Sequence, residues 1–145
     1  MSLREHSIYN CIINNALNYS DEIAIVSGDL SLTYGEIPLH VNSLARGLLK
    51  TGFEKGDRIG VLLNNCLEYA LLLAACARIG LITVCLNPRT SADEMLKILK
   101  QAKPKALIFK RATNSRLMNF VNCISIDNYT VLMMLQYFLL HLTNC

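Results

Sequence analysis

Short apolar runs alternate with stretches of helical periodicity through the middle of this chain. One of these stretches follows Ser91, where apolar residues recur every three to four positions, and the other, from 67 to 79, is apolar throughout most of its length. The apolar runs predict strands over residues 58–63, 81–86 and 105–109. Near-continuous apolar strands that are separated by helices are typical of a buried parallel sheet. The pattern therefore predicts an α/β fold with a parallel sheet flanked by helices.

The residues before this alternation predict a helix and a hairpin. Apolar side chains at helical spacing predict an amphipathic helix over residues 7–19. Two short β-prone runs, 23–27 and 30–33, surround Gly28-Asp29 and predict a β-hairpin. A further helix carries Ile37, Val41, Leu44, Ala45 and Leu48 on one face.

Three pairs of residues have the spacing of a capping box, in which a side chain and a backbone N–H bond reciprocally at a helix start. They are Thr33 with Glu36, Asn65 with Glu68, and Ser91 with Glu94. Gly52 and Gly80 are placed to end the first two helices. Pro38 lies just beyond the first turn in this interpretation and is expected to distort it.

Two of the helices differ in how they should pack. The stretch 67–79 is apolar nearly all round, which predicts a buried helix. The stretch after Ser91 is amphipathic, and its inner stripe is expected to consist of Met95, Ile98, Leu99 and Ala102.

The last third of the chain has a different character. Residues 111–128 are rich in Asn and Ser, with one candidate strand at 122–126, and residues 131–142 are apolar except for Gln136 and His141. Twelve helical residues span about 18 Å, whereas a bilayer core is about 30 Å thick. We therefore expect no transmembrane span. The segment 131–142 is open to three interpretations: a buried helix, an interfacial helix, or a sequence without a packing partner.

Charge and cysteine usage restrict the function classes further. The net charge is +3, and half of the basic residues lie between Lys97 and Arg116. Because no aromatic residues interleave with them and no binding motif is present, we expect a solvated helix face followed by a basic loop, and no nucleic acid. None of the six cysteines forms a Cys-x-x-Cys pair. With a polar N-terminus, this favours a cytoplasmic protein with free thiols.

Glycine distribution bears directly on nucleotide chemistry. A phosphate-binding loop needs closely spaced Gly, Ser and Thr, so that backbone N–H groups can reach the phosphates. The seven glycines stand apart from one another, at positions 28, 35, 47, 52, 56, 60 and 80. No glycine follows Gly80, so the sequence contains no phosphate loop after the predicted second strand.

Several motifs nevertheless resemble the front of a known enzyme family. Residues 32–37, Leu-Thr-Tyr-Gly-Glu-Ile, are similar to the first core motif of AMP-forming adenylating enzymes, which include acyl-CoA synthetases. Residues 41–48, Val-Asn-Ser-Leu-Ala-Arg-Gly-Leu, resemble the helix that follows it. The Gly-Asp-Arg sequence at 56–58, the Asn-Cys-Leu-Glu-Tyr sequence at 65–69, and residues 77–89, which end in Asn-Pro-Arg, resemble later segments in the same order. The resemblance covers residues 7–110.

The resemblance implies ATP-dependent activation of a carboxylate, such as a fatty acid, to an acyl-adenylate and then to an acyl-CoA. It implies ATP, Mg²⁺ and coenzyme A in the intact enzyme, and none of them in this chain, because the family's later catalytic motifs are absent. We expect residues 1–110 to be the N-terminal part of an AMP-binding domain and 111–145 to be a divergent tail with an apolar helix. The chain alone is expected to be inactive. The alternatives are a non-enzymatic α/β interaction module, or one half of a split synthetase completed in trans. The expected partners are the missing remainder of the synthetase or a second copy bound through the tail.

Residues that could carry chemistry have structural explanations that we favour. Capping explains Thr33, Glu36, Glu68 and the neighbouring Tyr69, and a turn followed by a strand explains Asp57 and Arg58. Arg89 is the most open case, since it follows a strand at the edge where α/β sheets bind ligands. The three histidines, His6, His40 and His141, lie far apart without metal-ligand spacing. The sequence therefore assigns no catalytic, cofactor-binding or metal-binding residue.

Overall fold

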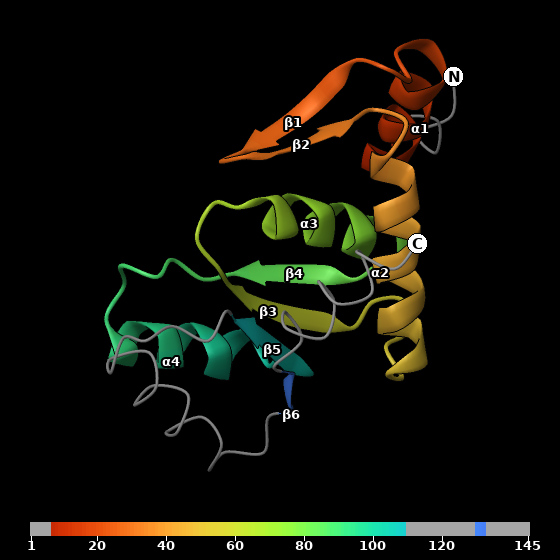
Figure 1. The fold of residues 1–145 in the computed structure, drawn as a ribbon. Helices are drawn as coiled ribbons and strands as arrows, with labels where there is room; N and C mark the ends of the chain where they lie inside the picture. The colour runs from red at the N-terminus through yellow and green to blue at the C-terminus, as the bar shows by residue number, and fades with distance from the viewer. Residues whose placement is uncertain (1–6, 110–129, 133–145) are drawn as a thin grey trace. The chain divides into compact units, whose positions relative to one another are not determined.

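The computed structural model describes residues 7–109 and 130–132, and within them the chain divides into two compact units. Unit 1 comprises residues 1–55 and 65–81, and unit 2 comprises residues 56–64 and 82–145. Figure 1 shows the helices and strands of both units. Each unit is described separately below.

Unit 1 contains three helices and a hairpin. The helices are α1 (Ile8–Asn18), α2 (Ile37–Lys50) and α3 (Leu67–Ile79), and the strands are β1 (Ile23–Ser27) and β2 (Leu30–Thr33). Helix α2 packs against α3, and α1 contacts both of them. The Tyr9 hydroxyl of α1 donates a hydrogen bond to Asn42 Oδ1 of α2 at 2.8 Å, and the Arg78 guanidinium of α3 lies 4.2 Å from the Tyr9 ring centre. One aromatic side chain thus connects all three helices.

The hairpin of unit 1 is as predicted. Strands β1 and β2 pair antiparallel, with Val26 opposite Ser31 and Ser27 opposite Leu30. Gly28 has a φ of 60°, which a glycine adopts without strain and which the tight turn at Gly28-Asp29 requires.

The helix ends of unit 1 confirm part of the prediction and correct the rest. Helix α2 begins at Ile37, so Pro38 lies inside the first turn, where no helical N–H is lost. The expected distortion is therefore wrong. Beyond Lys50, the Gly52 N–H bonds to Leu49 O at 3.0 Å and the Phe53 N–H to Leu48 O at 3.3 Å, and these two bonds form a Schellman motif.

Helix α3 departs from the prediction at its start. Its N-cap is Cys66 rather than Asn65, and no side-chain hydrogen bond caps it, so the capping box expected from Asn65 and Glu68 is wrong. Gly80 ends the helix in the left-handed conformation, as predicted. The helix is not buried all round, since its buried residues share one broad face while Ala70 and Ala77 are exposed; they are Leu71, Leu72, Ala74, Ala75 and Cys76.

Unit 2 is built on a four-stranded sheet in the order β4-β3-β5-β6. The strands are β3 (Arg58–Leu62), β4 (Ile82–Cys85), β5 (Ala106–Phe109) and β6 (Thr130–Leu132), and all three pairings are parallel. This confirms the predicted parallel sheet. Residues Thr130–Leu132 form a strand, so a helix that begins at Val131 is wrong, and residues 133–142 lie outside the described part, as does the candidate strand 122–126.

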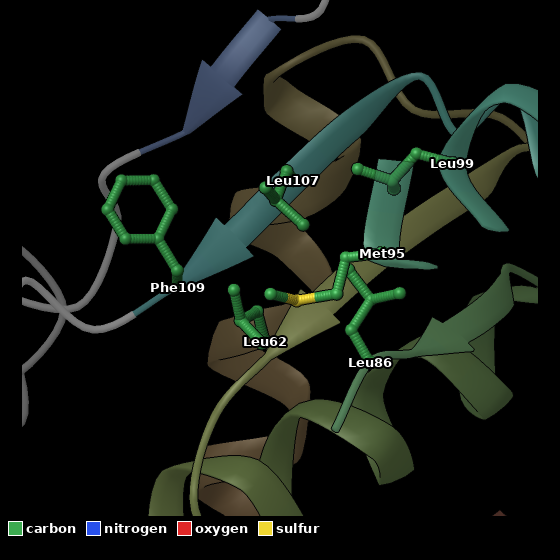
Figure 2. Packing of buried hydrophobic residues seen from close by; sticks show 6 residues of the cluster. All are labelled: Leu62, Leu86, Met95, Leu99, Leu107 and Phe109. Carbon is green, nitrogen blue, oxygen red and sulfur yellow. The ribbon is translucent and has the colours of Figure 1, made fainter. Parts of the chain in front are cut away.

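Helix α4 (Ala92–Ala102) covers one face of this sheet. Figure 2 shows its Met95 and Leu99 pointing toward side chains of the strands and of the segment after β4; the full cluster is Leu62, Leu86, Met95, Leu99, Leu107 and Phe109. Leu96 packs against this cluster, whereas Ile98 is 40% exposed. Ile98 therefore does not belong to the inner stripe, because the face of α4 that packs on the sheet includes Leu96 instead.

Close packing between α4 and the sheet depends on Gly60 in the centre of β3. A Cβ atom at this position would lie 2.8 Å from Leu107 Cδ1 and 3.6 Å from Leu99 Cδ2. Such a contact is shorter than carbon atoms tolerate. The absence of a side chain at Gly60 thus allows the leucines of the neighbouring strand and of α4 to fill this layer.

Candidate functional site

The residues that could carry chemistry fall into three groups in the structure. The first is the pair that precedes α2, Thr33 and Glu36. The second surrounds the start of β3 and includes Asp57 and Arg58. The third lies after β4, where Asn87 and Arg89 follow the end of the strand.

Thr33 and Glu36 form a reciprocal set of hydrogen bonds. The Thr33 N–H and hydroxyl donate to Glu36 Oε2 at 2.8 and 3.1 Å, and the Glu36 N–H donates to Thr33 Oγ1 at 3.3 Å. The bond from the Thr33 N–H, and next that from its hydroxyl, lowers the pKa of the Glu36 carboxyl, with a smaller contribution from His40. The predicted capping interaction is confirmed. The turn between Thr33 and Glu36 lies before α2, however, and is not the first turn of that helix. Both groups are used within the fold.

Asp57 and Arg58 connect the start of β3 to the end of α4. Arg58 Nη1 donates to the carbonyl oxygen of Ala102 at 3.2 Å, near the C-terminus of α4. Asp57 Oδ2 accepts a bond from Lys105 Nζ at 2.6 Å, and the Lys105 N–H donates to Arg58 O at 2.7 Å. A guanidinium near a helix C-terminus satisfies an unpaired carbonyl and complements the helix dipole. The structural interpretation of this pair is therefore supported. The hydrogen bonds to Ala102 and Lys105 could not be inferred from sequence, because each of them joins residues more than 40 positions apart.

The turn after β4 is formed by its own residues. Asn87 Oδ1 accepts the Arg89 N–H at 2.9 Å, and this bond closes an Asx turn before α4. At the start of α4, the Ser91 hydroxyl and the Glu94 carboxylate form the complete capping box that the sequence predicts. The Arg89 side chain is exposed. A residue at the carboxyl end of a parallel strand is well placed for a ligand, and among the described residues the Arg89 guanidinium has no ion pair.

Metal ligands and glycine-rich turns are sparse in the described part of the chain. Among the described residues, no group of three or more His, Cys, Asp or Glu side chains could hold a metal. Glycines with positive φ occur singly at 28, 52, 56 and 80, so the described residues contain no glycine-rich loop. His40 lies on α2, while His6 and His141 lie outside the described residues. No helix in the described part is long and apolar enough to cross a membrane.

A parallel sheet whose strands are separated by helices defines an α/β fold. The chain matches the family described as AMP-binding enzyme over residues 13–134, and it belongs to that family.

Relatives and solved structures agree with this assignment. The chain is 32% identical over 131 residues to the mitochondrial medium-chain acyl-CoA ligase ACSF2 of Pongo abelii, which covers 87% of this chain and 21% of that protein. It is 31% identical over 103 residues to the putative acyl–CoA ligase YdaB of Bacillus subtilis, which covers 71% of this chain and 20% of that protein. A structure of a putative long-chain-fatty-acid CoA ligase from Rhodopseudomonas palustris has a TM-score of 0.78 at 26% identity and covers 90% of this chain and 34% of that one. The chain thus spans about one fifth of the length of these curated relatives.

Proposed function

We propose that this chain supplies the structural front of an acyl-CoA ligase and does not by itself activate a carboxylate. The reaction of the complete enzyme would join a fatty acid to coenzyme A through an acyl-adenylate, with ATP and Mg²⁺. In this proposal, residues 1–110 build the start of the AMP-binding domain, and residues 111–145 form a divergent tail. The catalytic groups come from sequence that this chain does not contain.

The observation that carries the proposal is the engagement of Glu36, Asp57 and Arg58 in the fold, which leaves the exposed Arg89 as a lone candidate. Glu36 is held by Thr33, and Asp57 is held by Lys105. Arg58 caps α4 through Ala102. A catalytic site brings a nucleophile or base, its orienting partner and a charge-stabilising group together around an open position. None of the three groups described above has that arrangement.

The distribution of glycine supports the same conclusion from the sequence. Glycines 35 and 60 are tightly packed, since a Cβ atom would meet Ser20 Oγ at 2.6 Å or Leu107 Cδ1 at 2.8 Å. The glycines at 28, 52, 56 and 80 serve turns and helix ends. Six of the seven glycines are therefore used for packing and chain reversal, and the seventh, Gly47, lies inside α2.

The test is carboxylate-dependent exchange of pyrophosphate into ATP, with medium-chain and long-chain fatty acids as substrates. The purified chain should give only background exchange, while the human medium-chain acyl-CoA ligase ACSF2, a 32% identical relative, serves as the positive control in the same assay. Circular dichroism before the assay establishes that the chain is folded. Exchange above background that depends on the carboxylate would overturn the proposal.

A second candidate, completion of the enzyme by another polypeptide, is favoured by the exposed hairpin of unit 1. Its apolar residues Ile23, Val26 and Leu30 are 60–69% exposed. Exposed apolar surface of this kind is typical of an interface. Mixing this chain with a separately produced remainder of a synthetase should restore exchange if the enzyme is split. No gain in exchange with a folded remainder would exclude completion by that remainder.

A further inference from the structure

The described part of unit 2 concentrates positive charge at one end. Arg58 at the start of β3, Lys100 in the last turn of α4, and Lys103 and Lys105 in the loop before β5 converge there, and Lys97 lies one turn further back on α4. The convergence is established by hydrogen bonds, because Arg58 reaches Ala102 O and the Lys105 N–H reaches Arg58 O. We call these five residues the basic end.

Part of this charge is already used within the fold. Lys105 is paired with Asp57 at 2.6 Å, and Arg58 is bound to the helix carbonyl. By contrast, Lys97, Lys100 and Lys103 are exposed, and none of them forms an ion pair with another described residue. These three ammonium groups are available to an external anion.

The acidic residues of α4 partly offset the charge of Lys97, one turn away, but not that of Lys100 and Lys103. Asp93 and Glu94 lie in the first turn, and Glu94 is bound to Ser91 in the capping box. At about 1.5 Å per residue, Glu94 and Lys103 are separated by about 13 Å along the helix, which exceeds the Debye length of about 8 Å at physiological salt. The sequence beyond β5 continues the trend, with Lys110, Arg111 and Arg116 and no acid before Asp127.

The shape of the basic end favours an extended anionic surface over a small ligand. Its lysines project from a helix end and a loop, and the backbone N–H groups of Lys103 and Lys105 are occupied, since they bond to Leu99 O and Arg58 O at 2.7 Å each. Clusters of basic residues on one end of a helix are typical of segments that bind an anionic membrane surface.

A nucleic acid fits this surface less well. Single-stranded nucleic acids bind by stacking their bases on aromatic side chains, along with charge contacts. The sequence has no aromatic residue between Tyr69 and Phe109, and Phe109 is buried. We propose that the basic end docks this protein on an anionic lipid surface, with Lys97, Lys100 and Lys103 facing the headgroups.

The test is co-sedimentation of the full chain with vesicles of phosphatidylcholine, either alone or mixed with phosphatidylserine. Each lysine near an anionic surface contributes a factor of about five to binding, so three of them predict about a hundredfold preference for the anionic vesicles. The variant Lys97→Gln, Lys100→Gln, Lys103→Asn should lose most of that preference. Asparagine is used at 103 because Lys103 has a φ of 48°, a conformation that Asn tolerates.

The matched control is Arg46→Gln, Lys50→Gln, Arg89→Gln, which removes the same charge from exposed positions elsewhere. This control should keep nearly all of the preference, and thermal melts should show both variants folded. The proposal is overturned if the chain does not distinguish the vesicles, if both triple variants lose binding equally, or if single-stranded RNA at equal charge displaces the vesicles completely.

Discussion

The hairpin of unit 1 and the parallel strands of unit 2 have similar compositions and opposite environments. Both consist mainly of β-branched and aliphatic residues. In β3 and β5, Ile59, Val61, Leu107 and Ile108 are at most 3% exposed, whereas Val26 of β1 is 69% exposed. The difference teaches that β-propensity identifies a strand, while the number of covered faces decides how much that strand contributes to stability. Three sets of substitutions test this contrast.

The largest expected effect comes from placing a carboxylate in each region. Leu107→Asp should unfold unit 2, because burying an unpaired charge costs several kcal/mol, against a total stability of about 5–15 kcal/mol for a domain. Val26→Asp, the matched control in the hairpin, should change stability by less than about 0.5 kcal/mol. Urea unfolding followed by circular dichroism measures both. A Leu107→Asp protein that unfolds at the wild-type urea concentration would contradict the buried position of β5.

Glycine substitutions give an intermediate effect with two different causes. Gly60→Ala should cost about 1–3 kcal/mol, since the new methyl group meets Leu107 Cδ1 at 2.8 Å. Gly28→Ala should cost about 1 kcal/mol, since only the positive φ opposes it and the space around Gly28 is open. Asparagine separates the causes. It should be tolerated at 28, where it fits the turn, and should be worse than alanine at 60. Equal effects of alanine and asparagine at both sites would show that the packing argument is wrong.

The smallest expected effect is the pH dependence contributed by Glu36. Its pKa is lowered in the folded state by the hydrogen bonds from Thr33, so the unfolded state takes up a proton first. The stabilisation is therefore complete above the ordinary carboxyl pKa and is lost as the pH falls through the lower, folded value. Melting temperatures from about pH 6 to about pH 3 should fall more steeply for the wild type than for Glu36→Gln. Parallel curves would show that the carboxylate does not contribute.

Local signals along the chain predicted most helices, strands and ends correctly. Ser91 and Glu94 form a complete capping box, and Gly52 and Gly80 end their helices, because each of these interactions involves residues only a few positions apart. The same reasoning failed at Asn65, where the helix starts at another residue without a side-chain cap. Spacing alone does not show which residue is the N-cap, the last residue in an extended conformation before the helix.

The candidate site could be predicted only in part. The pairing of Thr33 with Glu36 follows from their spacing, and the structural role of Asp57 was expected from its place in a turn. The links that Asp57 and Arg58 make between elements could not be expected from the sequence. Arg58 bonds to Ala102 and Asp57 bonds to Lys105, and each bond joins residues more than 40 positions apart. Contacts of that range depend on the parallel pairing of β3 with β5, which brings the two strand starts together.

The sequence by itself determined the family, the alternation of strands and helices, and the lack of a phosphate loop, since motifs, periodicity and glycine spacing are local properties. Tertiary structure decided which side of each amphipathic helix or strand faces the core. Ile98 and Leu96 both fit a helical stripe, and only the position of the sheet beneath α4 selects Leu96 and leaves Ile98 exposed. It also decided that Thr130–Leu132 extend the sheet beside β5, because a short apolar run becomes a strand when a neighbouring strand satisfies its backbone hydrogen bonds.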